Sequence, residues 1–358
     1  MRPTVTPKQV HRETHEQATN ESAERQFTGT RPKALKKVKN SYTRIHFFFL
    51  SLCAVSTHTH MHESIPYSLN INGHLVELAE PQVMGILNAT PDSFYAGSRQ
   101  QTEEDIAVRT EQLQAEGADF IDVGAYSTRP GALLVTEEEE TERLRRALTI
   151  VRRIAPNARV SLDTFRARVA ERMVGDFGVG IINDVSGGND PDMFATVARL
   201  GVPYVLTHSP LGFQSKLTAS PESPENPNDK ASSPTLAKPF IPSLLLYFSE
   251  RIDALLALGQ KDIILDPGFG FGKSFAENYE LLMHLDELQV FGLPLLVGVS
   301  RKSMIYRLLD ILPEEALNGT TVLHTLALER GANILRVHDV APCKEVIKIM
   351  KQCSSPLA

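Results

Sequence analysis

The sequence has little cysteine: its 358 residues contain three, Cys53, Cys343 and Cys353. None forms a Cys-x-x-Cys pair, and the odd count argues against a framework of disulfides. This scarcity predicts a reducing compartment such as the cytoplasm. The His-Glu-x-x-His pattern is also absent, so we expect no tight zinc site.

Long apolar runs and a strong excess of charge are missing as well. The apolar stretch 47–55 is far shorter than the roughly 20 residues that a membrane-spanning helix needs. It also begins beyond the first 15–30 or so residues, where a secretory signal usually lies. The net charge of -6 and the pI of about 6.0 argue against nucleic acid or an anionic membrane as the main partner.

Residues 1–64 differ in composition from the rest, because lysine and arginine gather between positions 31 and 44. One interpretation is an arm that binds nucleic acid or a membrane. A disordered extension is favoured, since a single aromatic residue, Tyr42, lies among the charges. Met61 stands just before the first ordered-looking segment, which suggests that residues 1–60 are dispensable or reflect an upstream start site.

The region that follows begins with a hairpin signal and continues as alternating strands and helices. Two alternating runs flank Asn72-Gly73, which predicts a short β-hairpin. Short Val/Ile/Leu-rich runs then predict buried parallel strands at 82–87, 119–123, 159–163, 180–183, 203–207, 261–265, 294–299 and 332–337. Helical patterns lie between them at 102–116, 137–155, 166–175, 191–200, 242–259, 274–289, 303–330 (broken near Pro313) and 341–351.

Eight strands, each followed by a helix, predict an α/β protein with a (β/α)8 barrel (TIM barrel) over residues 65–353. A doubly wound open sheet is the alternative fold. Thr136 and Glu139 predict a capping box at the start of the second helix. The proline-rich segment 215–238 predicts a flexible insertion after the fifth strand, and an inert insertion is favoured over a lid.

Polar residues stand where each predicted strand ends, and in such a barrel these ends share one rim. The carboxylates and amides are Asp122, Asp163, Asn183 and Asp266, which suit the N–H groups of a flat heterocycle. The cationic or ionisable side chains are Arg129, Lys302, Arg336 and His338, and arginine suits phosphate oxygens. The pattern therefore predicts a ligand with a nitrogen-rich ring at one end and an anion at the other. A helix-capping role is favoured for Thr164 and Asp184.

A glycine-rich segment and the histidines are further candidates for a site. Gly268 to Ser274 superficially matches a phosphate-binding loop, but Pro267 occupies the position of its first glycine. A glycine-rich turn that presents Phe271 to a ring is the simpler interpretation. Among the histidines, His284 and His324 lie in helical stretches and are expected to be structural, whereas a site role is plausible for His208.

The residues in order resemble the dihydropteroate synthase family. The segments that carry the resemblance are 84–94, 119–131, 161–164, 182–185, 265–273, 300–303 and 335–339, spread over residues 66–350. The resemblance implies an enzyme of folate biosynthesis that joins 6-hydroxymethyl-7,8-dihydropterin diphosphate to p-aminobenzoate and releases diphosphate. It also implies Mg²⁺ as cofactor and a homodimer formed through the late barrel helices.

The same resemblance implies a role for each site residue. The pterin ring would contact Asp122, Asp163, Asn183, Asp266 and Lys302. The p-aminobenzoate side would be bordered by Thr128, Pro130, Phe271 and Ser300. The diphosphate would be held by Asn88, Thr128, Arg129, Arg336 and His338, with Asn88 also on Mg²⁺. The residues expected to matter most for catalysis are Asn88, Arg129, Asp163, Lys302, Arg336 and His338.

The chain departs from the family pattern at Ala96, where the first loop usually has aspartate, and at Thr207 and Ser209, where Met-His-Met is common. Two alternatives remain. One is a methyltransferase barrel that binds methyl-tetrahydrofolate, which could share the Asp and Asn ring contacts but would not need the phosphate-facing Arg129, Arg336 and His338. The other is a pterin-binding relative without catalytic activity, which the departures suggest but the intact Asn88, Arg129, Lys302 and Arg336 argue against.

Overall fold

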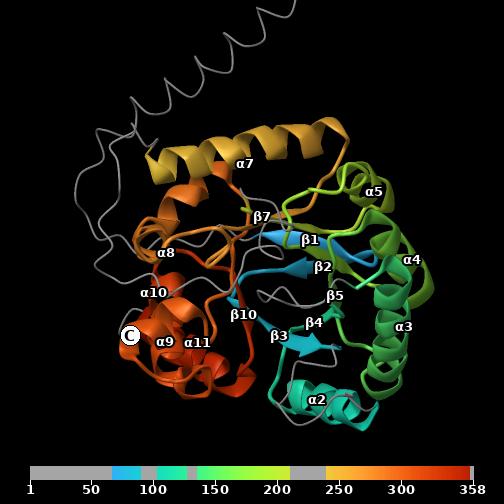
Figure 1. Ribbon diagram of the computed structural model, residues 1–358, viewed down its shortest axis with the longest axis horizontal. Coiled ribbons are helices and arrows are strands. Elements are labelled where there is room, and N and C mark those ends of the chain that lie inside the picture. The colour runs from blue at the N-terminus through green and yellow to red at the C-terminus, as the bar shows by residue number, and fades with distance from the viewer. Residues whose placement is uncertain (1–66, 90–102, 127–134, 210–238, 355–358) are drawn as a thin grey trace, which may run out of the picture. The chain divides into compact units, whose positions relative to one another are not determined.

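The structure is a computed structural model that describes residues 67–89, 103–126, 135–209 and 239–354. Eight parallel strands form its centre (Figure 1). They are β3 Gln82–Asn88, β4 Phe120–Gly124, β5 Val160–Asp163, β6 Ile181–Asp184, β7 Tyr204–Thr207, β8 Ile263–Asp266, β9 Leu296–Val297 and β10 Ile334–Val337. Every predicted strand is present. The predicted extension 1–64, the insertion 215–238 and the first-loop residue Ala96 lie outside the described residues.

The strands close into a barrel. Their order is β8-β7-β6-β5-β4-β3-β10-β9, with each neighbouring pair parallel. A parallel bridge between Leu265 and Leu295, with a 2.9 Å hydrogen bond from the Leu265 N–H to the Pro294 carbonyl, joins β8 to the start of β9. The barrel prediction is therefore confirmed, and the doubly wound alternative is wrong.

Helices surround the barrel as an outer ring (Figure 1). In chain order they are α2 Glu103–Ala115, α3 Glu137–Ile154, α4 Ala167–Phe177, α5 Met193–Leu200, α7 Phe240–Ala257, α8 Phe275–Met283, α9 Ser303–Leu309, α10 Leu317–Glu329 and α11 Val340–Ser354. Two 3-10 helices, η1 Leu285–Phe291 and η2 Pro313–Glu315, lie among them. Within the described ranges, no helix is both long and apolar enough to cross a membrane.

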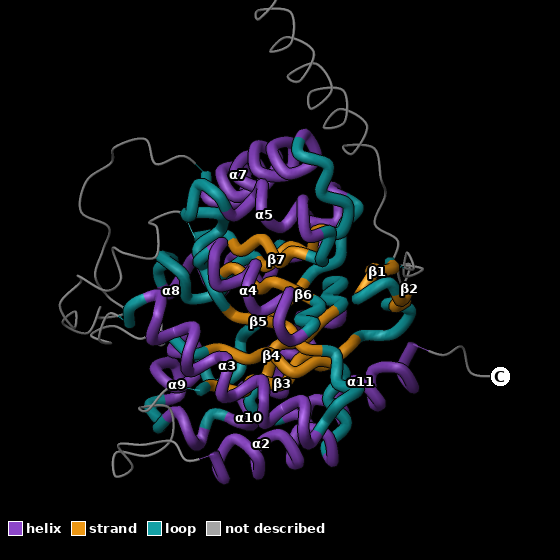
Figure 2. The backbone as a smooth tube through the Cα atoms, turned by 90° about the vertical axis from the view of Figure 1, so that its right-hand side faces the viewer, coloured by secondary structure: helices purple, strands orange, loops and turns teal. Residues whose placement is uncertain are grey.

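The predicted hairpin covers one end of the barrel (Figure 2). It consists of β1 Ser68–Ile71 and β2 His74–Glu77, joined by Asn72 and Gly73. Both turn residues have positive φ, 52° and 82°, as a two-residue type I′ turn requires. The Asn72 side chain donates to the Gly178 carbonyl at 2.9 Å, which ties the turn to the end of α4.

Side chains that point into the barrel form two layers. At the hairpin end the layer is wholly apolar, and with the hairpin it consists of Leu69, Ile71, Val76, Leu78, Met84, Phe120, Ile181, Val205, Ile264, Leu296 and Ile334. Two residues further along five of these strands, the inward side chain is polar: Asp122, Asn183, Thr207, Asp266 and Arg336. The intervening residues, such as Ile121 and Leu335, pack outward against the helices.

Local structure corrects two predictions. The Thr136 hydroxyl does accept the Glu139 N–H at 3.2 Å, but the Glu139 carboxylate pairs with Arg143 at 2.5 Å instead of completing a capping box. Strand β9 is only two residues long, whereas 294–299 was predicted. A two-residue bidirectional capping box does occur at α8, between Ser274 and Glu277.

Candidate active site

Four polar side chains from four strands meet inside the open end of the barrel. Asp122 on β4 accepts hydrogen bonds at one oxygen, Oδ2, from Asn183 Nδ2 at 3.0 Å and from Arg336 Nε at 2.7 Å. The second arm of the Arg336 guanidinium donates to Asp163 Oδ2 at 2.6 Å. Inward side chains of β4, β5, β6 and β10 thus form one network, as strand alternation requires.

Part of this network has unused hydrogen-bonding capacity. Asp122 is fully buried and Asn183 is 1% exposed. Within the described part of the chain, Asp122 Oδ1 and Asn183 Oδ1 have no hydrogen-bond partner, and neither do Ser161 Oγ and Thr207 Oγ1. Because buried polar atoms are nearly always paired, this grouping indicates a place where a ligand supplies the missing partners.

Asp266 and Lys302 lie on the other side of the same opening. Asp266 Oδ1 accepts the Gly268 N–H at 2.8 Å, and the Lys302 ammonium donates to the Phe269 carbonyl at 2.6 Å. The ammonium lies 5.0 Å from the centre of the Phe271 ring, a cation–π distance. The positive charge of Lys302 and the aromatic face of Phe271 therefore belong to the same corner of the site.

The glycine-rich loop after β8 is built from its own contacts. The Lys273 ammonium donates to the carbonyls of Gly268 at 2.7 Å, and of His208 and Phe271 at 3.3 Å each. Gly268 has φ +69°, and a Cβ there would lie 2.3 Å from the His208 carbonyl oxygen. A lysine that binds backbone carbonyls does not act as a phosphate-loop lysine, which supports the rejection of that motif.

Ser300 and His338 close the rim between β9 and β10. The Ser300 hydroxyl lies 3.2 Å from the His338 backbone nitrogen and 3.1 Å from its Nδ1. The His338 carbonyl in turn accepts a 2.6 Å hydrogen bond from Arg109 of α2. The imidazole is thereby fixed at the mouth of the barrel, beside Arg336.

Burial and crowded charge shift several pKa values. Burial, together with Asp122, Glu140 and Asp184, raises the pKa of Asp163 to about 7, although Arg336 opposes the shift. Burial also raises the pKa of Asp266. Burial would lower the pKa of Arg336, but the carboxylates of Asp122 and Asp163 raise it overall, so this guanidinium stays charged. The His338 ring reaches solvent on one side, yet the surrounding chain and Arg336 lower its pKa to about 4.

Comparison with known proteins identifies the family. The pattern that defines the family of pterin binding enzymes matches residues 84–338. The dihydropteroate synthase of Escherichia coli (strain K12) is 38% identical over 283 residues, which cover 78% of this chain and 94% of that protein. The enzyme of Bacillus subtilis is 36% identical over 273 residues, covering 75% and 87%.

Solved structures agree with this similarity. The dihydropteroate synthase of Xanthomonas albilineans, solved with 4-aminobenzoic acid, superimposes with a TM-score of 0.68 at 37% identity, covering 81% of this chain and 99% of that one. The Yersinia pestis enzyme, in complex with a sulfonamide drug, superimposes with a TM-score of 0.69 at 35% identity. The match covers 81% of this chain and 100% of that one. This chain belongs to the dihydropteroate synthase family.

The chain is therefore an enzyme, a dihydropteroate synthase that transfers a pterin group and releases diphosphate. Neither methyltransferase activity nor a purely binding function describes it. The departures at Thr207 and Ser209 are compatible with membership, because identity extends across the whole barrel. Side chains alternate along each strand, so the position of a residue in its strand determines whether it faces the site or the helices.

The structure brings most of the predicted site residues together. Asp122, Asp163, Asn183, Asp266, Phe271, Ser300, Lys302, Arg336 and His338 all lie at the open end of the barrel. Asn88, the last residue of β3, ends its strand beside Gly124 of β4 at the same end. Thr128, Arg129 and Pro130 lie outside the described residues, so their predicted roles stay predictions.

Strand alternation corrects the view of His208. Its ring is 5% exposed and packs against α7, with the Tyr247 ring centre at 4.5 Å, so it faces the helix layer and not the barrel interior. Burial, Lys273 and Arg251 lower its pKa to about 2, which keeps it neutral. A site role for His208 is therefore not supported.

Asp184 and Thr164 are structural, as expected. Asp184 faces outward and accepts hydrogen bonds from Tyr204 at 2.8 Å and from Ser186 Oγ at 2.6 Å, and the Thr164 hydroxyl donates to the buried Glu140 at 2.7 Å. Neither caps a helix, however. Sequence reasoning missed Ser161 and noted Thr207 only as a departure from the family pattern. Alternation places both residues inward, and their hydroxyls are buried.

Proposed function

We propose that this synthase joins 6-hydroxymethyl-7,8-dihydropterin diphosphate to p-aminobenzoate with the pterin ring held by Asp122 and Asn183. The observation that carries the proposal is the pair of buried acceptors, Asp122 Oδ1 and Asn183 Oδ1, that lack partners within the described residues. The ring of a dihydropterin has adjacent N–H donors along one edge. Such an edge would satisfy both acceptors at once.

Arg336 would act between the ring and the diphosphate. Its guanidinium already contacts Asp122 and Asp163, and its raised pKa keeps it charged throughout turnover. A permanent positive charge at this position stabilises the negative charge that develops on a departing diphosphate. His338, directly after the same strand, would contribute hydrogen bonds instead of charge at neutral pH, because its pKa is lowered to about 4.

The carboxylates would stabilise the other half of the reacting bond. When diphosphate leaves with the bonding electrons, positive charge develops on the pterin methylene, and the negative charge of Asp122 would stabilise it. Asp163, whose pKa is raised to about 7, would add its negative charge in its ionised form. The aromatic amine of p-aminobenzoate needs mainly to be positioned for attack. Phe271 and Ser300 are the described residues that we assign to this task, with Thr128 and Pro130 alongside.

The donors at the open end fit a magnesium ion that binds chiefly through the substrate. Within the described residues, no group of three or more histidine, cysteine or acidic side chains is placed to hold a metal ion. Mg²⁺ commonly takes only one or two protein ligands and completes its shell with phosphate oxygens and water. The Asn88 amide oxygen would be that ligand, and the ion would supply further charge neutralisation for diphosphate.

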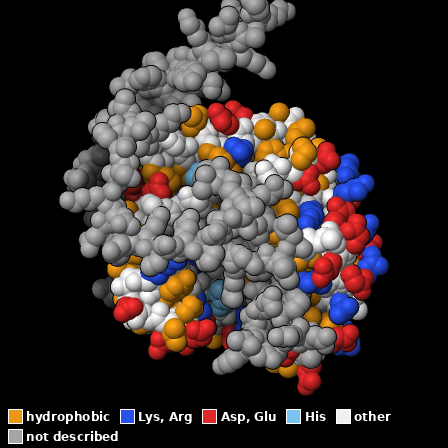
Figure 3. Space-filling model, in the orientation of Figure 1, with side chains coloured by type: hydrophobic (Ala, Val, Ile, Leu, Met, Phe, Trp, Pro, Cys, Tyr) orange, Lys and Arg blue, Asp and Glu red, His pale blue; other side chains and the backbone are white. Residues whose placement is uncertain are grey.

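A homodimer formed through the late barrel helices is also proposed. Four large apolar side chains are exposed on α9, the turn after it and α10: Leu308, Leu309, Leu312 and Val322. Figure 3 shows apolar atoms gathered at lower left, near the position of α9, whereas mixed charges cover α3 and α4 at the right. Sedimentation velocity should show a dimer for the unsubstituted protein and a monomer for Leu309→Glu. A monomeric unsubstituted protein would refute the proposal.

The cytoplasmic location stays a prediction.

One assay tests the assignment of the pterin site. The purified protein is supplied with pterin diphosphate, Mg²⁺ and p-aminobenzoate, while diphosphate and dihydropteroate are followed together. Equal amounts of both products are expected, with loss of turnover and of pterin binding in Asp122→Asn. Turnover near that of the unsubstituted protein would show that the ring binds elsewhere.

A further inference from the structure

The pairing of β9 with β10 continues beyond the backbone ladder. The ladder pairs Leu296 with Ile334 and Val297 with Leu335, and then it stops. Continued in the same register, it would pair Ser300 with His338 and Arg301 with Asp339. These are the residues whose side chains are hydrogen-bonded, all 38 positions apart. Side chains thus extend the ladder up to the rim of the active site.

Arg301 has a backbone conformation that must be held in place. Its φ is +52°, a left-handed conformation that is unfavourable for a residue other than glycine. Its N–H donates to the Thr320 hydroxyl at 3.0 Å, which ties the turn to α10. The chain changes direction sharply at Arg301, between Ser300 and Lys302. The positions of both these site residues therefore depend on the conformation of Arg301.

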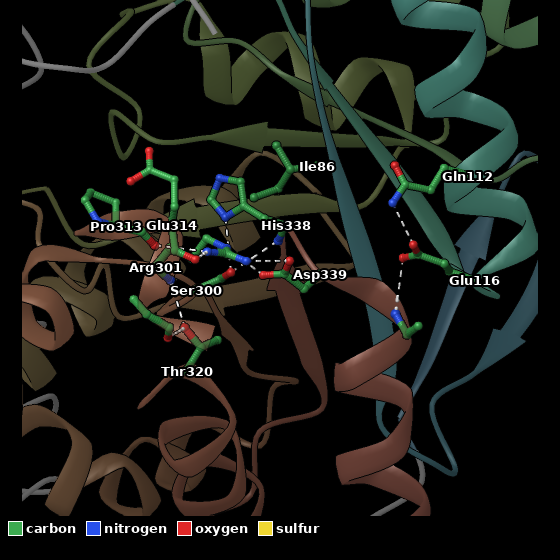
Figure 4. Close-up of polar contacts among 12 residues, drawn as sticks. Ile86, Gln112, Glu116, Ser300, Arg301, Pro313, Glu314, Thr320, His338 and Asp339 are labelled. Carbon is green, nitrogen blue, oxygen red and sulfur yellow. Dashed lines mark hydrogen bonds and ion pairs between the residues drawn. The ribbon is translucent and has the colours of Figure 1, made fainter. Parts of the chain in front are cut away.

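The Arg301 side chain reaches toward Asp339 and the 3-10 helix η2 (Figure 4). Its Nε and Nη2 donate to the two oxygens of Asp339 at 2.7 and 2.9 Å, a bidentate pair. Its Nη1 donates to the carbonyls of Pro313, at 3.0 Å, and Glu314. One guanidinium therefore connects the turn after β9, the 3-10 helix η2 and the turn after β10.

We propose that Arg301 and Asp339 form a positioning pair for the p-aminobenzoate side of the reaction. The inference rests on the proposed roles of their neighbours: Ser300 and Lys302 flank Arg301, and His338 precedes Asp339. The pair touches no reacting atom. It fixes the separation of the β9 and β10 turns, and with it the position of the Ser300 hydroxyl relative to His338.

The decisive variant is Asp339→Asn, because it leaves the backbone at residue 301 and the bonds to η2 in place. An amide nitrogen would replace one acceptor of the bidentate pair and face an arginine donor. The KM for p-aminobenzoate is expected to rise about tenfold or more, since small displacements of positioning groups are costly. Pterin affinity measured without p-aminobenzoate should change less than threefold, because Lys302 is the one proposed pterin contact that adjoins the pair, whereas Asp122 and Asn183 stand on β4 and β6.

The matched control is Lys344→Met. Lys344 of α11 pairs with Asp119 at 2.5 Å, just before β4 at the hairpin end, and that pair is about as exposed as Arg301–Asp339. The control should lower the melting temperature by a similar small amount and leave KM and kcat unchanged. A rise in KM with Asp339→Asn alone would thus separate positioning from general stability.

A double-mutant cycle with Ser300→Ala completes the test. If the pair acts through Ser300, adding Asp339→Asn to Ser300→Ala should raise KM much less than it does alone. A loss of melting temperature with unchanged KM would overturn the proposal and leave Arg109 as the group that holds His338. Failure of Ser300→Ala itself to affect KM would instead refute the proposed role of Ser300, so the two failures are distinguishable.

Discussion

The two layers inside the barrel differ although they belong to the same strands. At the hairpin end, Phe120, Ile181 and Ile334 fill the interior with apolar side chains. Two residues further along, Asp122, Asn183 and Arg336 occupy equivalent inward positions and form a charged network. The first layer is complete without a ligand, whereas the second contains buried acceptors with no partner among the described residues.

Inward residues that stabilise the fold and inward residues that serve function thus lie only two positions apart on the same strand. Burial of apolar surface stabilises the hairpin end, and the hairpin covers it with Leu69 and Ile71. At the open end, buried charge and unpaired oxygens disfavour folding, so their presence is explained by ligand binding. Substitutions in the apolar layer should therefore lower stability more than activity, and substitutions in the polar layer should lower activity more than stability.

The largest effect is expected from Phe120→Ala in the apolar layer. Removal of this fully buried ring should lower the free energy of unfolding by about 3–5 kcal/mol. The specific activity of the folded fraction should remain within about threefold of the unsubstituted enzyme. Urea denaturation and a coupled assay measure the two quantities, and a loss of activity without a loss of stability would break the comparison.

Asp122→Asn, on the same strand, should show the reverse. It replaces a buried acceptor, Oδ1, by an amide donor that faces the N–H edge of the pterin. We expect kcat/KM to fall about 100- to 1000-fold, comparable to the loss of one group that stabilises a transition state. The melting temperature should change little. Steady-state kinetics and thermal unfolding check this, and activity near that of the unsubstituted enzyme would contradict the assignment.

A pair of matched substitutions on β7 should give smaller effects. Val205→Thr introduces a hydroxyl into the apolar layer and should cost about 1–3 kcal/mol of unfolding free energy. Thr207→Val removes a buried hydroxyl without a partner in the described chain, and should leave stability unchanged or raise it. Equal destabilisation of both variants in chemical denaturation would show that the layers do not differ as argued.

The smallest expected effect is a change in how the free energy of unfolding depends on pH. Because the folded-state pKa of Asp163 is raised to about 7, the folded protein holds a proton there that the unfolded chain has released. This contribution to stability is complete below the unfolded pKa of about 4 and is lost as the pH rises through about 7. Asp163→Asn should flatten the decline between these values, and unfolding curves at several pH values would reveal an unchanged slope if the shift is absent.

Much of the fold follows from local patterns. Every strand was predictable, because buried parallel strands are short Val/Ile/Leu-rich runs. The Asn72-Gly73 turn was predictable too, since both residues tolerate positive φ. The length of β9 was not predictable. After Val297 the backbone pairing with β10 ends, and side-chain hydrogen bonds of Ser300 and Arg301 replace it.

The candidate site was predicted less evenly. Asp122, Asn183 and Arg336 were identified as polar residues at strand ends, and they do meet. His208 was misjudged because a position at a strand end does not tell which way a side chain points. Alternation from Val205, which faces inward, sends His208 outward to α7 and leaves Thr207 inside.

Local composition and the order of the motifs were enough to establish the order of strands and helices, the family, and the set of polar residues at the open end. Which of those residues share a hydrogen bond, and which oxygens have no partner within the described residues, depends on how the chain folds. The tertiary structure alone also revealed that Arg301 and Asp339 join two turns. These are contacts between residues far apart in the chain, and closure of the barrel brings them together.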